Sequence, residues 1–228
     1  MNLFWLDTDP TIAAQAHHDV HVRKMLLEGV QLLCTAFEEP DLLVKAHKRG
    51  DSWLYCSPTD RLAADLLPYA HTHINHPCAL WVRASRANFD RAIELAEALA
   101  AEFRYRFDKP HGSEAALDWV KRHRSEAQVP DGPLTPYALA MPEKYALAAG
   151  QQQWMVSVND VIRPSLSMHT LAYAYRTYYR AEKRGHWRTK RAGLGRRALA
   201  AVGIGTATDR VWVPAKWTRR SPPEWFIL

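Results

Sequence analysis

Four polar residues between positions 17 and 28 have types and a spacing that suit acid–base or covalent chemistry. His17, His21, Lys24 and Glu28 recur at intervals of three or four, which places them along one side of a helix. Imidazole, ammonium and carboxylate groups move protons, and an amine also attacks carbonyl carbons. The stripe follows the amino terminus closely, so we expect a free α-amine to be able to join it.

An amine beside a carboxylate is the pair that imine chemistry requires. The nucleophile is a neutral amine, an acid helps the leaving group to depart, and a carboxylate steadies the cationic intermediate. We expect Met1 to be the nucleophile, Glu28 to stabilise the imine and His21 to orient the substrate or donate a proton. Asn2 is expected to block removal of Met1, so that the free amine belongs to Met1, and Lys24 is a second amine. The alternative is that Lys24 and Glu28 form an ordinary ion pair on a helix.

Two groups of histidines have the residue type of metal ligands. The first is His17 and His21, which have i,i+4 spacing, and the second is His71, His73 and His76. Neither group has the HExxH spacing or a cysteine nearby, so we expect no metal and no other cofactor. Hydrogen bonds to phosphates or to a flipped base are another use. For His76, which precedes Pro77, a role in starting a helix is the favoured interpretation.

Composition limits the class of protein. The 228 residues are 47% hydrophobic and 24% charged, as in ordinary globular proteins. There is no run of 18 apolar residues, so no membrane span is expected, and the acidic start lacks the basic region of a secretory signal. Three cysteines without CxxC spacing favour a reduced, cytoplasmic setting. No P-loop, dinucleotide fingerprint or GxSxG elbow occurs, so no nucleotide cofactor is expected.

Positive charge is concentrated near the carboxyl terminus. Residues 173–228 hold 13 Lys and Arg against 3 Asp and Glu, whereas residues 1–172 hold 17 against 21. Aromatic residues lie between these basic residues, a pattern typical of non-specific nucleic-acid binding, so DNA is the expected partner. The alternative is a solvated helix face leading into a flexible tail. The predicted DNA or substrate contacts are His17, His18, Arg23, Asn75, His76, Arg83, Arg176, Tyr179, Arg180, Lys183, Arg188, Lys190 and Arg191.

Hydrophobic periodicity predicts a mainly α protein with one compact, multi-helix domain over residues 1–184. A basic, partly irregular extension is expected over residues 185–228, either as a hairpin near 200–214 or as a mobile tail. Leu3–Leu6 is a short strand or a buried arm. Helices are expected at 10–37 with a break near His18, and at 59–67, 77 onward, 87–107, 113–123 and 164–184. Asn75 and Ser113 are expected to cap two of them, and Trp5, Trp53, Trp81 and Trp119 to lie in the core.

The order of these features resembles the phage-type pyrimidine-dimer DNA glycosylases with AP-lyase activity, the endonuclease V type. Asp19-Val20-His21-Val22 stands where that family has Asp-x-His-Leu, and Glu28 follows His21 by seven residues, as the family's glutamate follows its histidine. A second block, Asn75-His76-Pro77 with Arg91–Leu99, is similar to the family's third-helix region. The two blocks cover about the first 110 residues.

This resemblance implies a compact all-α fold and a terminal amine that attacks an extruded nucleotide. The chain departs from the family at two positions, because Asn2 retains Met1 and Leu27 replaces an arginine. The expected function is a DNA glycosylase/AP-lyase-like repair enzyme, in the cytoplasm of a bacterial host cell if a phage encodes it. The alternatives are a phage transferase that modifies DNA bases and a non-catalytic DNA-binding accessory protein.

Overall fold

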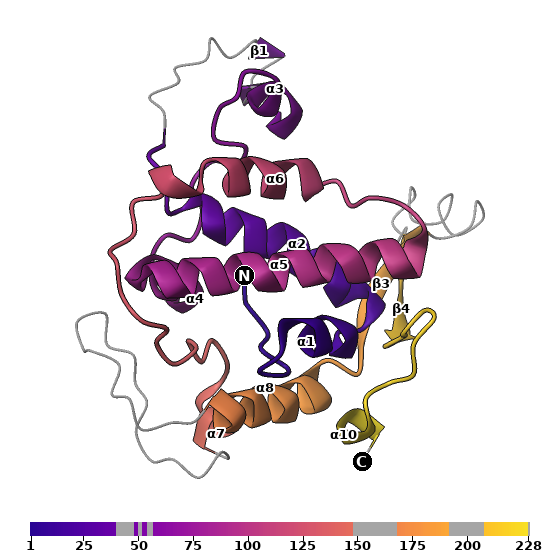
Figure 1. Cartoon of the computed structure of the whole chain (residues 1–228). Coiled ribbons are helices and arrows are strands. Elements are labelled where there is room, and N and C mark those ends of the chain that lie inside the picture. Colours follow the sequence, from indigo (N-terminus) through magenta and orange to yellow (C-terminus); the bar gives the residue numbers. More distant parts are fainter. Residues whose placement is uncertain (40–47, 50–51, 54–56, 148–167, 192–207, 228) are drawn as a thin grey trace.

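The protein is mainly helical, which confirms the predicted fold class. The computed structural model describes residues 1–39, 48–49, 52–53, 57–147, 168–191 and 208–227 (Figure 1). The helices are α1 (Pro10–Ala16), α2 (Asp19–Cys34), α3 (Pro58–Ala63), α4 (Pro77–Ala84), α5 (Arg86–Phe107), α6 (Glu114–Arg122), the 3₁₀ turn η1 (Arg124–Glu126), α7 (Glu143–Leu147), α8 (Met168–Glu182) and α10 (Glu224–Ile227). None of these helices is long and apolar enough to cross a membrane.

Helix α5 is the element around which the others pack. It contacts α1, α2, α4 and α6, and Figure 1 shows it crossing the middle of the molecule with α6 above it and α1 and α8 below it. Its apolar positions are buried as the periodicity predicted, from Phe89 through Phe103, and Phe107 is partly exposed. The Ser85 hydroxyl accepts a hydrogen bond from the backbone of Asn88 and caps the helix.

The core includes three of the four predicted tryptophans. Trp5, Trp81 and Trp119 are buried, whereas the side chain of Trp53 lies outside the described part. Trp5 stacks on Tyr137 with a ring-centroid distance of 4.1 Å. Large aromatic surfaces at the centre supply much of the apolar burial that stabilises a helical domain.

The first six residues form a buried arm rather than a strand. Leu3–Leu6 is almost fully buried. The backbone nitrogen of Asn2 bonds to Glu28, and the Phe4 ring stacks on His21, seven residues earlier on α2. The arm therefore runs along α2 in the opposite direction. Met1, three residues before Phe4, also lies beside Glu28. About three extended residues and about seven helical residues both span roughly 10 Å, so the contacts of Met1 and Phe4 are geometrically matched.

The predicted break between α1 and α2 is confirmed. Asp9 caps α1, Pro10 occupies its first turn, and His17 and His18 are extended. Tertiary groups satisfy the free backbone nitrogens where α2 begins, since His18 donates to the Tyr179 hydroxyl. The nitrogen of Asp19 donates to the carbonyl of Lys216.

Helix caps differ from the sequence-based predictions at three positions. Helix α3 is capped by Ser57 and ends at Ala63, earlier than predicted. The predicted Asn75 cap of α4 is wrong, because Nδ1 of His76 accepts the bond from the Cys78 nitrogen, so His76 is the residue that starts this helix. Ser113 occupies the cap position of α6 but makes no side-chain cap bond.

The carboxyl-terminal region contains a two-stranded antiparallel ribbon of β3 (Gly185–Arg191) and β4 (Thr208–Pro214). The sequence predicted a hairpin near residues 200–214. Strand β4 lies in that range, whereas its partner β3 begins earlier in the chain, at Gly185. A Cβ at Gly185 would lie 2.4 Å from the Val213 carbonyl oxygen, so this close pairing requires glycine. A shorter antiparallel pair joins β1 (Lys48–Arg49) to β2 (Ser52–Trp53).

Residues after β4 pack back onto the helical body. The Trp217 indole donates to the carbonyl of Ala16 over 3.1 Å, and Arg220 forms an ion pair with Glu102 of α5. Helix α10 packs against α8. Residues 215–227 are therefore part of the packed structure around the α1–α2 junction.

Candidate active site

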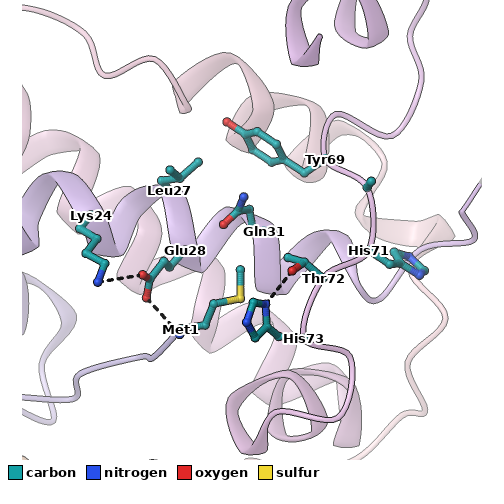
Figure 2. A pocket seen from close by; sticks show the side chains of 10 residues that line it. Met1, Lys24, Leu27, Glu28, Gln31, Tyr69, His71, Thr72 and His73 are labelled. Carbon is teal, nitrogen blue, oxygen red and sulfur yellow. Dashed lines mark hydrogen bonds and ion pairs between the residues drawn. The ribbon is translucent and has the colours of Figure 1, made fainter. Parts of the chain in front are cut away.

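The amino-terminal amine lies beside the carboxylate of Glu28, as the sequence predicted. The Met1 nitrogen is 3.9 Å from Oε2 of Glu28, and the backbone nitrogen of Asn2 donates to the same oxygen over 3.0 Å. Nζ of Lys24 is 3.4 Å from Oε1. Figure 2 shows the carboxylate between the two amines. The predicted helix pair of Lys24 and Glu28 also exists, and the two interpretations of Glu28 are therefore compatible.

Asn2 positions the amine through its side chain. Its Nδ2 donates to the Ala140 carbonyl over 2.6 Å, and its Oδ1 accepts a hydrogen bond from the Tyr175 hydroxyl over 3.2 Å. Both Asn2 and Tyr175 are buried. With the buried arm on its other side, the terminal residue has little freedom to leave Glu28.

A cavity of about 510 Å³ opens beside this amine. Figure 2 shows polar side chains from α2 and from the loop before α4 facing this space. The lining residues are Met1, Lys24, Leu27, Glu28, Gln31, Tyr69, Ala70, His71, Thr72 and His73. An amine, a carboxylate and imidazoles in one solvent-accessible hollow can bind a polar ligand and transfer protons to it.

His21 is not part of this cavity, which corrects the role predicted for it. Its side chain is packed between Phe4, at a centroid distance of 5.2 Å, and Tyr179, at 5.1 Å. Burial lowers the pKa of His21 far below its ordinary value, and neighbouring positive groups lower it further. The physical reason is the position of the arm, because Phe4 covers the face of α2 that carries His21.

His17 and His18 are also buried, and neither lines the cavity. Nδ1 of His17 contacts the Ala13 carbonyl oxygen at 2.7 Å, and burial lowers the pKa of His17 to about 3. His17 therefore packs as a neutral aromatic group. Asp19, which follows these histidines, binds Arg106 and Thr218.

The predicted DNA contacts of the amino-terminal half occupy different places. Arg23 is exposed beside a smaller cavity of about 190 Å³, and Asn75 is exposed in the loop before α4. His76 is half-buried, and its pKa is lowered by burial and then by the charge of the nearby terminal amine. Arg83 donates to the Ile74 carbonyl over 2.6 Å and so braces this loop.

The predicted contacts on α8 include structural residues. Arg176 donates to the Leu6 carbonyl over 2.6 Å and pairs with Asp7. Tyr179 is fully buried and has no exposed face on which a base could stack. Burial contradicts the predicted DNA contact of Tyr179, whereas Arg176 remains partly exposed and fastens the arm to α8.

Arg180 and Lys183 retain partial exposure at the end of α8. Lys183 lies 5.1 Å from the centre of the Tyr178 ring, where a cation is favoured. Further along the chain, Arg188, Lys190 and Arg191 lie on β3, and their side chains are outside the described part.

The loop before α4 supplies side chains that sequence reasoning did not assign to the amine. The sequence groups His71 and His73 with His76 as possible metal ligands or phosphate contacts, and it does not single out Thr72. Within the described residues, no three His, Cys, Asp or Glu side chains are arranged to hold a metal ion. Gln31 was missed although it carried a signal, because it continues the stripe of Lys24 and Glu28 by three residues.

The geometry thus joins a terminal amine, a carboxylate and two loop imidazoles at one cavity. Comparisons with protein-family models, with curated proteins and with solved structures found no match.

Proposed function

We propose that this protein is a DNA-acting enzyme of the glycosylase/AP-lyase type, which engages an extruded nucleotide through an imine at the α-amine of Met1. The observation that carries the proposal is the 3.9 Å separation between that amine and Oε2 of Glu28 at an open cavity. Amine-based lyases need both groups at one place, because the carboxylate stabilises the cationic imine.

Glu28 suits the two tasks that follow from this position. Its carboxylate takes a proton from the ammonium group, which leaves a neutral amine to attack C1′ of the sugar. After the imine has formed, the same carboxylate lies beside the positive nitrogen and stabilises it. Lys24 and the nitrogen of Asn2 hold the two carboxylate oxygens and thereby orient them.

The cavity and the charge of the chain are compatible with such a substrate. A volume of about 510 Å³ is within the range of small-molecule pockets and accommodates one extruded nucleotide. The net charge of +6 favours association with a polyanion, and exposed Arg23 and Lys24 lie on the helix that carries Glu28.

Borohydride trapping on a duplex that contains one abasic site tests the proposal. Intact mass and terminal sequencing first establish that the purified protein begins at Met1. We expect the wild type to form a covalent adduct, acetylation of the terminal amine to abolish it, and Glu28→Gln to slow its formation by about 100-fold or more. Glu97→Gln is the matched control, because Glu97 pairs with a lysine on the protein surface.

The other outcomes identify the alternatives. Salt-sensitive binding without an adduct contradicts the enzyme proposal and favours the accessory protein. Base modification without strand cleavage favours the transferase. An adduct that survives terminal acetylation and is lost in Lys24→Gln would transfer the nucleophilic role to the lysine.

A further inference from the structure

We infer that His73 is the imidazole that serves the amino-terminal cavity, acting as the acid that protonates the departing hydroxyl when the imine forms. This inference rests on the proposed function, since it names a further catalytic residue for the same site. The sequence pattern assigned that task to His21, which the arm covers. His73 lines the cavity with Met1 and Glu28, and Figure 2 shows its ring beside Met1.

Thr72 holds the His73 ring by one nitrogen. The Thr72 hydroxyl is 2.6 Å from Nδ1 of His73. A hydroxyl both donates and accepts, so this contact persists whether Nδ1 is protonated or not. Nε2 of His73 makes no hydrogen bond to any residue of the described ranges, and the side chain is exposed. The second ring nitrogen is therefore available to a ligand in either protonation state.

The backbone at His73 has an uncommon conformation that places this ring. Its φ is 52°, in the left-handed region that residues other than glycine rarely adopt. The His73 carbonyl accepts a hydrogen bond from the His76 nitrogen over 2.8 Å, which closes the turn into α4. Strained backbone persists where the surroundings enforce it, and it is concentrated at functional sites.

The neighbouring histidines are occupied by structural contacts. His71 contacts the Phe37 carbonyl oxygen through Nε2 at 3.0 Å and Glu39 through Nδ1 at 3.5 Å. Nδ1 of His76 caps α4. Among the two histidines that line the cavity, His73 is thus the one that keeps a ring nitrogen without a partner in the described residues.

The charged and titratable groups around His73 come from three elements. The arm contributes the Met1 amine, and α2 contributes Lys24 and Glu28. The loop contributes His71 and His76, and Glu39 after α2 pairs with His71. The set has one carboxylate at the amine, that of Glu28, and one behind the loop, that of Glu39.

The step assigned to His73 is a single proton transfer. The neutral Met1 amine adds to the aldehyde carbon of an abasic sugar, the nitrogen then loses one proton and the oxygen gains one, and the product is a neutral carbinolamine. The His73 imidazolium then gives its Nε2 proton to this hydroxyl, the carbon–oxygen bond breaks and water leaves. The nitrogen lone pair completes the protonated imine, and the neutral imidazole regains a proton from solvent.

The left-handed backbone allows variants that preserve the fold. Asparagine and glycine both adopt positive φ readily, so His73→Asn and His73→Gly remove the imidazole without new backbone strain. His169→Asn is the matched control, because His169 is an exposed histidine on α8 and does not line the cavity. Imidazole added to His73→Gly supplies the missing group from solution.

The measurement is the single-turnover rate of borohydride-trapped adduct on abasic DNA. We expect both His73 variants to form the adduct about 100-fold more slowly than the wild type, and His169→Asn to match the wild-type rate. Free imidazole should raise the rate of His73→Gly at least tenfold and leave the other proteins unchanged. Wild-type adduct with unchanged rates in both His73 variants overturns this inference and leaves the proposed function standing. Slower rates without imidazole rescue also overturn it, because they indicate a structural role. Absence of a wild-type adduct overturns both proposals.

Discussion

At the scale of single residues, burial decides which histidines can take part in chemistry. His17 is fully buried, its pKa is lowered to about 3 by desolvation, and its Nε2 has no hydrogen-bond partner. His21 lies under Phe4 in the same way. His73, four residues before α4 begins at Pro77, is exposed at the cavity. The same side chain is thus an aromatic packing group in one place and a solvent-accessible base in another.

Acid sensitivity is the consequence of burying neutral histidines. The pKa of His17 is about 3 in the folded protein and 6.5 in the unfolded chain, so its contribution to stability is complete above pH 6.5. That contribution is lost as the pH falls from 6.5 toward 3, at up to about 1.4 kcal/mol per pH unit. Urea unfolding at pH 7.5 and 5.0 measures it.

In that experiment we expect His17→Met to lose about 2 kcal/mol less on acidification than the wild type does. His169→Asn, which changes an exposed histidine, is expected to lose as much as the wild type. Equal acid losses in the His17 variant and the wild type would contradict the assignment of His17 as a neutral buried group.

At the scale of elements, Arg106 ties the end of α5 to the junction of α1 and α2. Its guanidinium is fully buried and donates to the carbonyls of Gln15 and His17 over 2.9 and 2.8 Å. It also pairs with Glu102 at 2.6 Å and Asp19 at 3.1 Å. Carbonyls at the end of a helix have no partner within that helix, so one arginine satisfies the end of α1 and the charges beside it.

Replacing Arg106 should therefore be costly. We expect Arg106→Met to lower the free energy of unfolding by about 3–5 kcal/mol, because it leaves buried carbonyls and carboxylates without their donor. The matched variant Arg104→Met removes an exposed arginine of the same helix that pairs with Glu114, and it should cost far less stability than Arg106→Met. Denaturant titration of both variants is the measurement, and similar losses would argue against the buried network.

At the scale of the whole molecule, the two ends of the chain meet the same helices. The arm of residues 1–6 lies on α2, and residues 215–220 are bonded to the α1–α2 junction and to α5. Trp217 is buried, with its ring 4.7 Å from that of Phe226. The carboxyl-terminal region thus helps to hold the junction from which α2 carries Glu28 to the amine.

Replacement of Trp217 tests whether the packing of residues 215–220 on the α1–α2 junction stabilises the protein. Trp217→Ala should lower the free energy of unfolding by about 3–5 kcal/mol through lost packing and the lost bond to Ala16. Trp217→Phe should recover most of that loss. Tyr173→Ala, at an exposed position of α8, should change stability by less than about 0.5 kcal/mol. A small effect of Trp217→Ala in urea unfolding would show that the segment contributes little.

The local sequence pattern was sufficient to predict the helical class and the residues that α2 contributes to the site. Periodicity predicted the α class, the α1–α2 break and the α5 core face, because these depend on neighbours within about one turn. The stripe of Lys24 and Glu28 was predicted for the same reason. Caps were less accurate, since His76 rather than Asn75 accepts the bond at α4.

The tertiary structure determined which groups lie against Lys24 and Glu28 of α2. Spacing alone places residues 21 and 28 on one helix face, but the antiparallel path of the arm puts Met1 on Glu28 and Phe4 on His21. The loop that brings His73 to the cavity lies more than forty residues beyond Glu28 in sequence. Helical periodicity carries no information over that distance, because which segments pack together depends on the burial of the whole chain.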